Sequence, residues 1–595
     1  MGGARIPVDQ GEILNAMARE YCMLSVILCA ILPGALAIET VPAATPDPAA
    51  TRAVPPLAAG VETPAISAAP PTWPILRAMP DSAAFVLAFP PLPKLRDRLF
   101  ALSGKFAGSA ELLAQASALL SASLGLGDSP GLRDIEVFLD SKGLAPDSPW
   151  GIFVDLGETA SDASEATRKL AGATRGRVLA PAMDYHPPAV LVMAGVSQSD
   201  LAESTVREFL PRIVGGSQDS PKTVNTGSGS DSYLHRLQNG WGYSTKDGWL
   251  YVTNSESLFH AVLDRQASSA DVNYGLAAWP GATPDDIVLL TRPGKATPDP
   301  INLLAVGSYA SQVYPTIRWP TATAETQREF RDFYSPEAGA EAIMATLSIA
   351  QDRVELASRV DVSKHPWLAR VHDASHAPEL AGFIGPGSVL SGYFKWGDSL
   401  VVTARGCLGV VPVELRESYW NPICHALEVF ACGETVFSIG PGAPPVIRLF
   451  THVSNESAAL GLLGPFLDKA RGDDSGRETW ALSAGPVKLY GQLEGSTLVC
   501  TSLEAELPSM RDRVRAGGGI SFIEMLDPPV RKEAIVSLIS LDASRPEDLD
   551  SILTVFDIAG RGAIMKWIGG VREIRAGKIA DRPWLTQFLT VFLKP

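Results

Sequence analysis

The sequence lacks the short motifs that identify several common enzyme classes. It has no HExxH zinc motif, no GxxxxGK[ST] phosphate loop and no GxGxxG after a strand. It has no CxxC pair, so zinc-ribbon and thioredoxin-like sites have no support. We therefore expect no cofactor and no metal site, and we favour a protein that is not an enzyme.

Basic residues are also scarce. The chain has 50 Lys and Arg against 65 Asp and Glu, which gives a formal net charge of −15. Binding to nucleic acid depends on clustered basic side chains that neutralise phosphates, and the sequence has no basic stripe. We therefore expect no nucleic-acid partner.

The N-terminal apolar run is too short to span a membrane. It extends from Cys22 to Leu32, whereas a spanning helix needs about 20 apolar residues. Pro33-Gly34 and the small-residue pattern Ala35-Leu36-Ala37 follow it, as in an export signal. The pattern predicts a signal peptide over residues 1–37 and a periplasmic or secreted protein.

Acidic residues weaken the signal pattern and leave two alternatives. Asp9, Glu12 and Glu20 lie where a signal peptide carries positive charge. Translation from Met17 would remove two of them. Alternatively, the segment stays uncleaved as an N-terminal membrane anchor, which would be the chain's only attachment to a membrane.

Only six cysteines are present, and Cys22 and Cys29 lie within the predicted signal. The other four are Cys407, Cys424, Cys432 and Cys500. In an exported protein an even number permits two disulfides, in any of three pairings. Buried thiols are an equally acceptable interpretation, because cysteine is among the most buried residue types.

Residues 38–74 contain mainly Ala, Pro and Thr and hardly any large apolar side chain. Such a segment cannot bury enough surface to offset the entropy of ordering, so we predict a disordered tether. Folded material follows, as a first lobe over 75–370 and a second over 380–595.

The two predicted lobes share a repeated pattern. The segment 188–197 returns as 445–454 at an offset of 257, and Asp-Gly at 247–248 has a counterpart in Glu494-Gly495. The offsets fall in order, from 306 between Pro80 and Pro386 to 247 between Gly248 and Gly495. Ordered offsets are typical of a duplication with later loop insertions.

Local patterns within each lobe predict strands, helices and hairpins. Strands are expected at 84–89, 150–154 and 189–196, a helix at 109–124, and another at 197–213. Hairpins are expected over 241–253, 345–358 and 488–500, and paired strands over 571–574 and 585–589. We predict an α+β protein of two related lobes, with mixed or antiparallel sheets covered by helices on one side.

The first hairpin carries the candidate ligand-binding residues Trp241, Tyr243, Trp249 and Tyr251. Exposed aromatic rings on one face would form a platform for a sugar or a peptide. Packing of the same rings beneath a helix is the interpretation we favour, because aromatic pairs commonly stabilise sheets.

Other polar clusters are weaker candidates. His372, Asp373 and His376 place two imidazoles at helical spacing, as in metal sites, but no third protein ligand can be named beyond Asp373. A surface linker between the lobes explains them better. Ser475, in Asp473-Asp474-Ser475-Gly476, has the surroundings of a nucleophile, but no base can be assigned to it and a polar loop is favoured.

The pattern resembles a broad group of uncharacterised bacterial exported proteins with a duplicated α+β, domain-of-unknown-function architecture. The resemblance rests on Pro80-Asp81-Ser82, the predicted helix at 197–213, and the block from Asp247-Gly248 to Ser255-Glu256-Ser257. It implies export and an α+β fold, and brings no catalytic residue.

Three functional hypotheses follow. The first is a non-enzymatic cell-envelope protein that binds a protein, a peptide or a lipid in a cleft between the lobes. The second is a hydrolase whose site is assembled from residues far apart in the sequence. The third is an interaction domain that an uncleaved signal tethers to the membrane.

Overall fold

The structure of the chain is a computed structural model. The described residues are 74–103, 105, 132–157, 188–214, 222–225, 233–237, 240–268, 286–292, 343–361, 379–383, 387–396, 416–463, 467–472, 478–484, 487–517, 523, 535–556, 561–581 and 584–594. The predicted signal peptide, the tether except Pro74 and the expected helix at 109–124 lie outside them.

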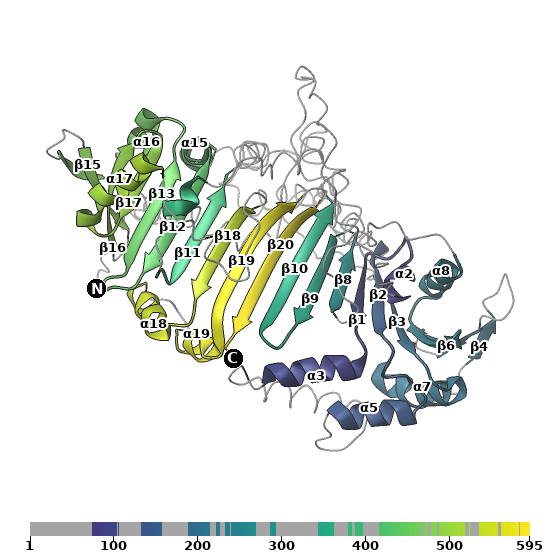
Figure 1. Cartoon of the computed structure of the whole chain (residues 1–595). Coiled ribbons are helices and arrows are strands. Elements are labelled where there is room, and N and C mark those ends of the chain that lie inside the picture. Colours follow the sequence, from purple (N-terminus) through teal and green to yellow (C-terminus); the bar gives the residue numbers. More distant parts are fainter. Residues whose placement is uncertain are drawn as a thin grey trace, which may run out of the picture.

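Strands dominate the described part of the chain (Figure 1). Those of the first half are β1 (Phe85–Phe89), β2 (Trp150–Asp155), β3 (Ala189–Gly195), β4 (Lys222–Asn225), β5 (Tyr233–Arg236), β6 (Gly242–Lys246), β7 (Trp249–Thr253), β8 (Ile287–Thr291), β9 (Ile343–Ile349) and β10 (Arg353–Asp361). Those of the second half are β11 (Leu390–Lys395), β12 (Glu434–Gly440), β13 (Val446–His452), β14 (Leu467–Gly472), β15 (Glu478–Ala484), β16 (Val487–Glu494), β17 (Thr497–Thr501), β18 (Ile535–Asp542), β19 (Val571–Asp581) and β20 (Trp584–Leu593).

Helices connect the strands in both halves. They are α2 (Pro74–Arg77), α3 (Leu92–Ser103), α5 (Leu132–Ser141), α7 (Ser199–Val214), α8 (Glu256–Ala267), α15 (Asn421–Phe430), α16 (Glu456–Leu463), α17 (Leu507–Ala516), α18 (Pro546–Val555) and α19 (Arg561–Ile568), with short turns η2 (Leu380–Phe383), η4 (Arg416–Trp420) and η6 (Glu504–Glu506). The combination of helices with a large antiparallel sheet makes this an α+β protein.

All the described strands join in one antiparallel sheet of 20 strands. The halves meet edge to edge, because β10 pairs with β20 from Arg353 opposite Phe592 to Asp361 opposite Trp584. The sequence predicts a cleft between the two lobes, whereas the structure joins them at this place through the backbone hydrogen bonds of one continuous sheet.

The strand order is the same in both halves when it is read outwards from this junction. The first half runs β10, β9, β8, β1, β2, β3, β7, β6, β5, β4, and the second runs β20, β19, β18, β11, β12, β13, β17, β16, β15, β14.

The two halves also share side-chain hydrogen bonds at equivalent positions. The Val190 amide donates to Asn254 Oδ1 over 2.7 Å, and the Ile447 amide donates to Ser502 Oγ over 2.9 Å. Thr253 Oγ1 accepts from the amide two residues later over 3.0 Å, as Thr501 Oγ1 does over 3.1 Å.

Local sequence explains the hairpin that links β6 to β7. Asp247 and Gly248 adopt φ values of 51° and 80°, and Asp-Gly is favoured where both central residues of a turn are left-handed. The following helix α8 begins where Ser255 Oγ accepts from the Leu258 amide over 3.2 Å.

Helices lie on both faces of the sheet in its outer regions. On the first face, α2 and α8 cover the N-terminal half, while η2 and α17 cover the C-terminal half. On the second face, α7 packs on one half, and α15, α16, α18 and α19 pack on the other. The expectation of helices on one side was wrong, because outer strands such as β12, which is buried at every position, carry large apolar side chains on both faces, Val436 on one and Phe437 and Ile439 on the other.

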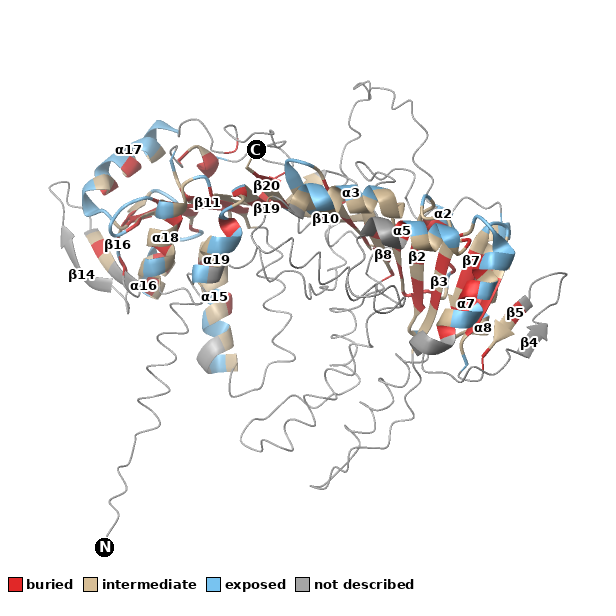
Figure 2. Cartoon of the chain, turned by 90° about the horizontal axis from the view of Figure 1, so that it is seen from below, coloured by how far each residue is buried: buried red, intermediate tan, exposed pale blue. Residues whose placement is uncertain are grey.

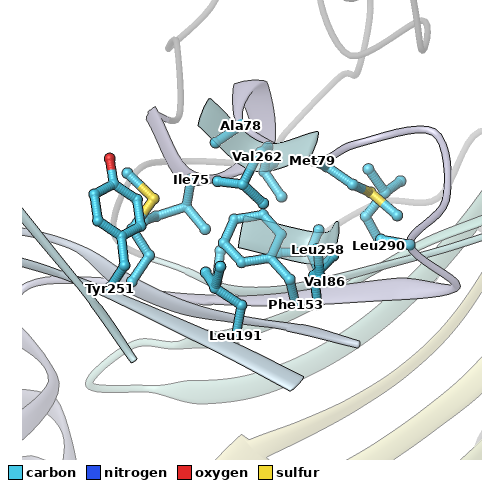
Figure 3. Packing of buried hydrophobic residues seen from close by; sticks show 14 of the residues in the cluster. Ile75, Ala78, Met79, Val86, Phe153, Leu191, Tyr251, Leu258, Val262 and Leu290 are labelled. Atoms are coloured by element: carbon cyan, nitrogen blue, oxygen red, sulfur yellow. The ribbon is translucent and has the colours of Figure 1, made fainter. Parts of the chain in front are cut away.

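The first-face core of the N-terminal half joins strands and helices that are distant in sequence (Figure 3). Its fully or almost fully buried members include Ile75 of α2, Met79 just after α2, Val86 of β1, Phe153 of β2, Leu191 of β3, and Leu258 and Val262 of α8. This core fixes one end of the sheet.

Candidate ligand-binding face

The middle of the sheet differs from its ends. The central strands β18, β19, β20, β10, β9 and β8 cross between two groups of helices (Figures 1 and 2). Since side chains alternate between the faces of a strand, the registers assign each residue of these strands to one face. We call the second-face side chains of these strands the central face, and those on the opposite side the reverse face.

The central face is apolar apart from a few residues. Its members are Ile287, Leu289 and Thr291 of β8; Ile343, Ala345, Leu347 and Ile349 of β9; Val354, Leu356, Ser358 and Val360 of β10; Leu585, Gln587, Leu589 and Val591 of β20; Ile574, Ala576, Lys578 and Ala580 of β19; and Ser537, Ile539 and Leu541 of β18. Lys578 is the only charged residue among them.

One row of apolar side chains crosses the middle of this face, with one residue from each strand. It consists of Ile287, Leu347, Leu356, Leu589, Ala576 and Ile539. Leu356 and Leu589 stand directly opposite each other across the junction, and they are 47% and 41% exposed. The two halves of the molecule therefore meet beneath an accessible apolar surface.

A polar row lies next to the apolar row, two residues further along the strands. It contains Ser358, Gln587, Lys578 and Ser537. Burial lowers the pKa of the Lys578 ammonium, because desolvation disfavours the charged form. Within the described residues, no carboxylate forms an ion pair with this lysine.

The reverse face carries buried polar and charged groups. Arg575 is 3% exposed; its Nε and Nη2 donate to the Glu573 carboxylate over 2.6 and 2.8 Å, and its guanidinium lies 4.5 Å from the centre of the Phe592 ring. Burial also lowers the pKa of Arg359. An antiparallel sheet with one solvated face normally exposes its polar side, so the accessible leucines of the central face are unusual.

Helices limit the central face along one side. Leu541, Ile574 and Val591 pack against the apolar cluster that α18 and α19 form with the sheet. The apolar row begins two residues beyond them on each strand, so it runs alongside this cluster.

The aromatic residues of the first hairpin do not form a platform. Tyr243 lies on the second face with α7, Tyr251 lies on the first face with α8, and both are fully buried. The Tyr251 hydroxyl donates to Gln266 Oε1 over 2.6 Å, and burial raises the pKa of Tyr251 to about 12. A platform that uses these tyrosines is therefore wrong, since they pack under different helices.

The two tryptophans are separated in the same way. Trp241 packs against the apolar cluster below α7, and Trp249 packs against the core below α8. The sheet thus places Trp241 and Tyr243 on one face and Trp249 and Tyr251 on the other, and cross-strand packing explains all four rings.

The other sequence candidates lie outside the described residues. This applies to His372, Asp373 and His376, and to Ser475. Among the residues that are described, no group of three or more His, Cys, Asp or Glu side chains is arranged to hold a metal.

Three of the four cysteines expected in the mature chain are described, and they carry thiols. Cys424 and Cys500 are buried and Cys432 is exposed. Burial raises the pKa of Cys500 to about 12, so this thiol is unreactive near neutral pH. Two disulfides would need all four cysteines, so that hypothesis was wrong. The interpretation as buried thiols fits Cys424 and Cys500 but not Cys432, which is exposed. Cys407 lies outside the described residues.

In the described residues, no helix combines the length and apolar character needed to cross a bilayer.

Sequence analysis missed the central face, although part of its signal was present. In β10, apolar or small residues alternate with charged ones from Arg353 to Asp361, with Ala357 as the exception. The alternation identifies two faces of a strand, but the face that stays accessible depends on where the helices pack.

Comparisons with known proteins add little. No protein-family model matches the chain, and no curated protein matches it in sequence. Crystal forms III and IV of TP0453 each give a TM-score of 0.23 at 12% identity, covering 36% and 38% of this chain and 79% and 82% of that chain. This similarity is too low to support a statement about fold or function.

Proposed function

We propose that this chain is an exported, non-enzymatic binding protein of the bacterial cell envelope, and that its central face binds the acyl chain of a lipid or fatty acid. The observation that carries the proposal is the accessible leucine pair Leu356 and Leu589, within an unbroken apolar row. Burying a leucine fully contributes about 1.5–3 kcal/mol, so covering the exposed part of each would contribute roughly 1 kcal/mol.

The dimensions of the row fit a single hydrocarbon chain. From Ala576 on β19 to Ile287 on β8 the row crosses four strand spacings, or about 19 Å. An acyl chain fills one leaflet, which is half of a hydrocarbon core about 30 Å thick. A chain of about 15 Å would therefore lie across the strands within the row.

Location in the envelope is supported by the N-terminal sequence. The apolar run from Cys22 to Leu32, with small residues after it, favours export to the periplasm or beyond. An uncleaved segment would instead keep the protein at a membrane, which is also compatible with a lipid ligand.

Internal duplication is part of the same proposal. The shared strand order, the repeated hydrogen bonds at Asn254 and Ser502, and the offset of 257 between β3 and β13 all support a module that was copied once. Joining the copies through β10 and β20 would have created the central face at their junction, so the proposed site belongs to neither copy alone.

Fluorescence titration with dansyl-labelled dodecanoic acid and its methyl ester tests this function. We expect both probes to bind the wild type, and Leu356→Glu or Leu589→Glu to weaken both at least tenfold. Leu503→Glu is the matched control, because Leu503 is 39% exposed outside the central face.

Two results would contradict the proposal. One is an absence of binding to the wild type, and the other is equal weakening by the Leu503 variant. Sedimentation of the same variants covers a further outcome: a wild-type dimer that Leu356→Glu dissociates would make this face a contact between copies.

A further inference from the structure

Lys578 belongs to the polar row of the central face and lies directly beside the apolar row. It faces Gln587 of β20 on one side and Ser537 of β18 on the other. Residues paired across antiparallel strands have Cβ atoms about 4.5–5.5 Å apart, so these polar side chains are its immediate neighbours.

Two residues along the strand from Lys578, Ala576 belongs to the apolar row. Two residues of strand correspond to about 7 Å. A ligand with its head group at Lys578 would therefore place the first part of its chain over Ala576 and Leu589. Its remaining carbons would lie over Leu356 and Leu347, in the direction of Ile287.

In the described strands, the central face carries a positive charge but no carboxylate. Among the described side chains of the central strands, the carboxylates of Glu355, Asp361, Asp542 and Glu573 all belong to the reverse face, so none of them shares a face with Lys578. The ammonium is partly buried, yet within the described residues it lacks the carboxylate that such a group normally has as a partner. An anion from outside the chain would supply the missing charge.

Building on the proposed function, we infer that the ligand is a single-chain amphiphile with an anionic oxygen head, either a carboxylate or a phosphate. Its head binds the Lys578 ammonium while its chain covers Leu589 and Leu356. The Gln587 amide, which stands beside Lys578, is placed to donate a hydrogen bond to the same head. The ligand gains an ion pair in partly desolvated surroundings, where such a pair is stronger than in water.

The test compares dodecanoate, dodecyl phosphate and methyl dodecanoate as competitors of the dansyl probe. On the wild type we expect both anions to compete at least tenfold better than the ester. Lys578→Gln should reduce the anions to the level of the ester without changing the ester itself, and Lys578→Arg should retain the preference. Lys566→Gln, which removes an exposed lysine from α19, is the matched control and should change nothing.

The outcomes separate this inference from the function on which it rests. Equal competition by anions and ester on the wild type, or a preference that survives Lys578→Gln, would overturn the role of Lys578 while sensitivity to Leu356→Glu keeps the acyl-chain site. Failure of every competitor and of the probe to bind would overturn both. A preference for only one of the two anions would support the inference and identify the head group.

Discussion

Apolar side chains are covered differently in the outer regions of the sheet and in its central strands. In the outer regions helices pack on both faces, so β12 is buried at every residue. At the centre, β10 and β20 present Leu356 and Leu589 on an accessible face and bury Ala357 and Thr590 on the other. The comparison separates residues that hold the fold together from residues that are available to a ligand.

A matched pair of leucines gives the largest difference between the regions. Leu191 of β3 is fully buried, so Leu191→Ala should lower the free energy of unfolding by about 2–5 kcal/mol. Leu356→Ala should lower it by only about 1 kcal/mol, because only about half of that side chain is buried. Urea denaturation measures both; equal losses would mean that the central face is part of the core.

A buried carboxylate gives the next largest effect, within an outer region. Glu434 accepts hydrogen bonds from the amides of Glu379 and Leu380 over 2.8 and 2.7 Å and from the Tyr393 hydroxyl over 3.1 Å. In Glu434→Gln the side-chain oxygen can still accept from the two amides, but the negative charge that strengthens these bonds is lost, which should cost about 1–3 kcal/mol of unfolding free energy.

The control for that variant is Glu504→Gln, which changes an exposed glutamate of the same half. Its unfolding free energy should stay within about 0.5 kcal/mol of the wild type. If the two variants were equally stable in urea, the hydrogen bonds to Glu434 would not hold η2 to the sheet.

The smallest effect compares equivalent helix starts in the two halves. Ser255 caps α8 through its side chain, whereas Leu503, at the start of η6, makes no such hydrogen bond. Ser255→Ala should therefore lower the free energy of unfolding by about 1 kcal/mol, and Leu503→Ala should lower it by much less. Calorimetry of both variants checks this, and a larger loss from Leu503→Ala would contradict it.

Sequence patterns predicted the local elements well. The strand expected at 189–196 is β3, Ala189–Gly195, and the hairpin expected around Asp247-Gly248 joins β6 to β7. Both depend on neighbouring residues alone: apolar runs for the strand and left-handed backbone for the turn. Pro211, a residue type that often ends helices, lies inside α7, which continues to Val214.

The pairing of distant strands could not be predicted in this way. Whether β10 pairs with β20 depends on backbone edges more than two hundred residues apart, and no local pattern names the partner. The aromatic platform could not be excluded from sequence for a related reason. Tyr243 and Tyr251 have similar sequence settings, but they lie on opposite faces of the sheet. Lys578 gave no signal as a site, because its setting exists only after β18, β19 and β20 are side by side.

Photo-crosslinking tests the central claim most directly. A fatty acid with a diazirine in the middle of its chain would be bound to the full-length protein, irradiated, and located by mass spectrometry of peptides. The account predicts labels in residues 343–349, 353–361 and 584–593, which are β9, β10 and β20, and their loss in Leu356→Glu. Labels concentrated on the outer helices, or unchanged by that variant, would contradict it.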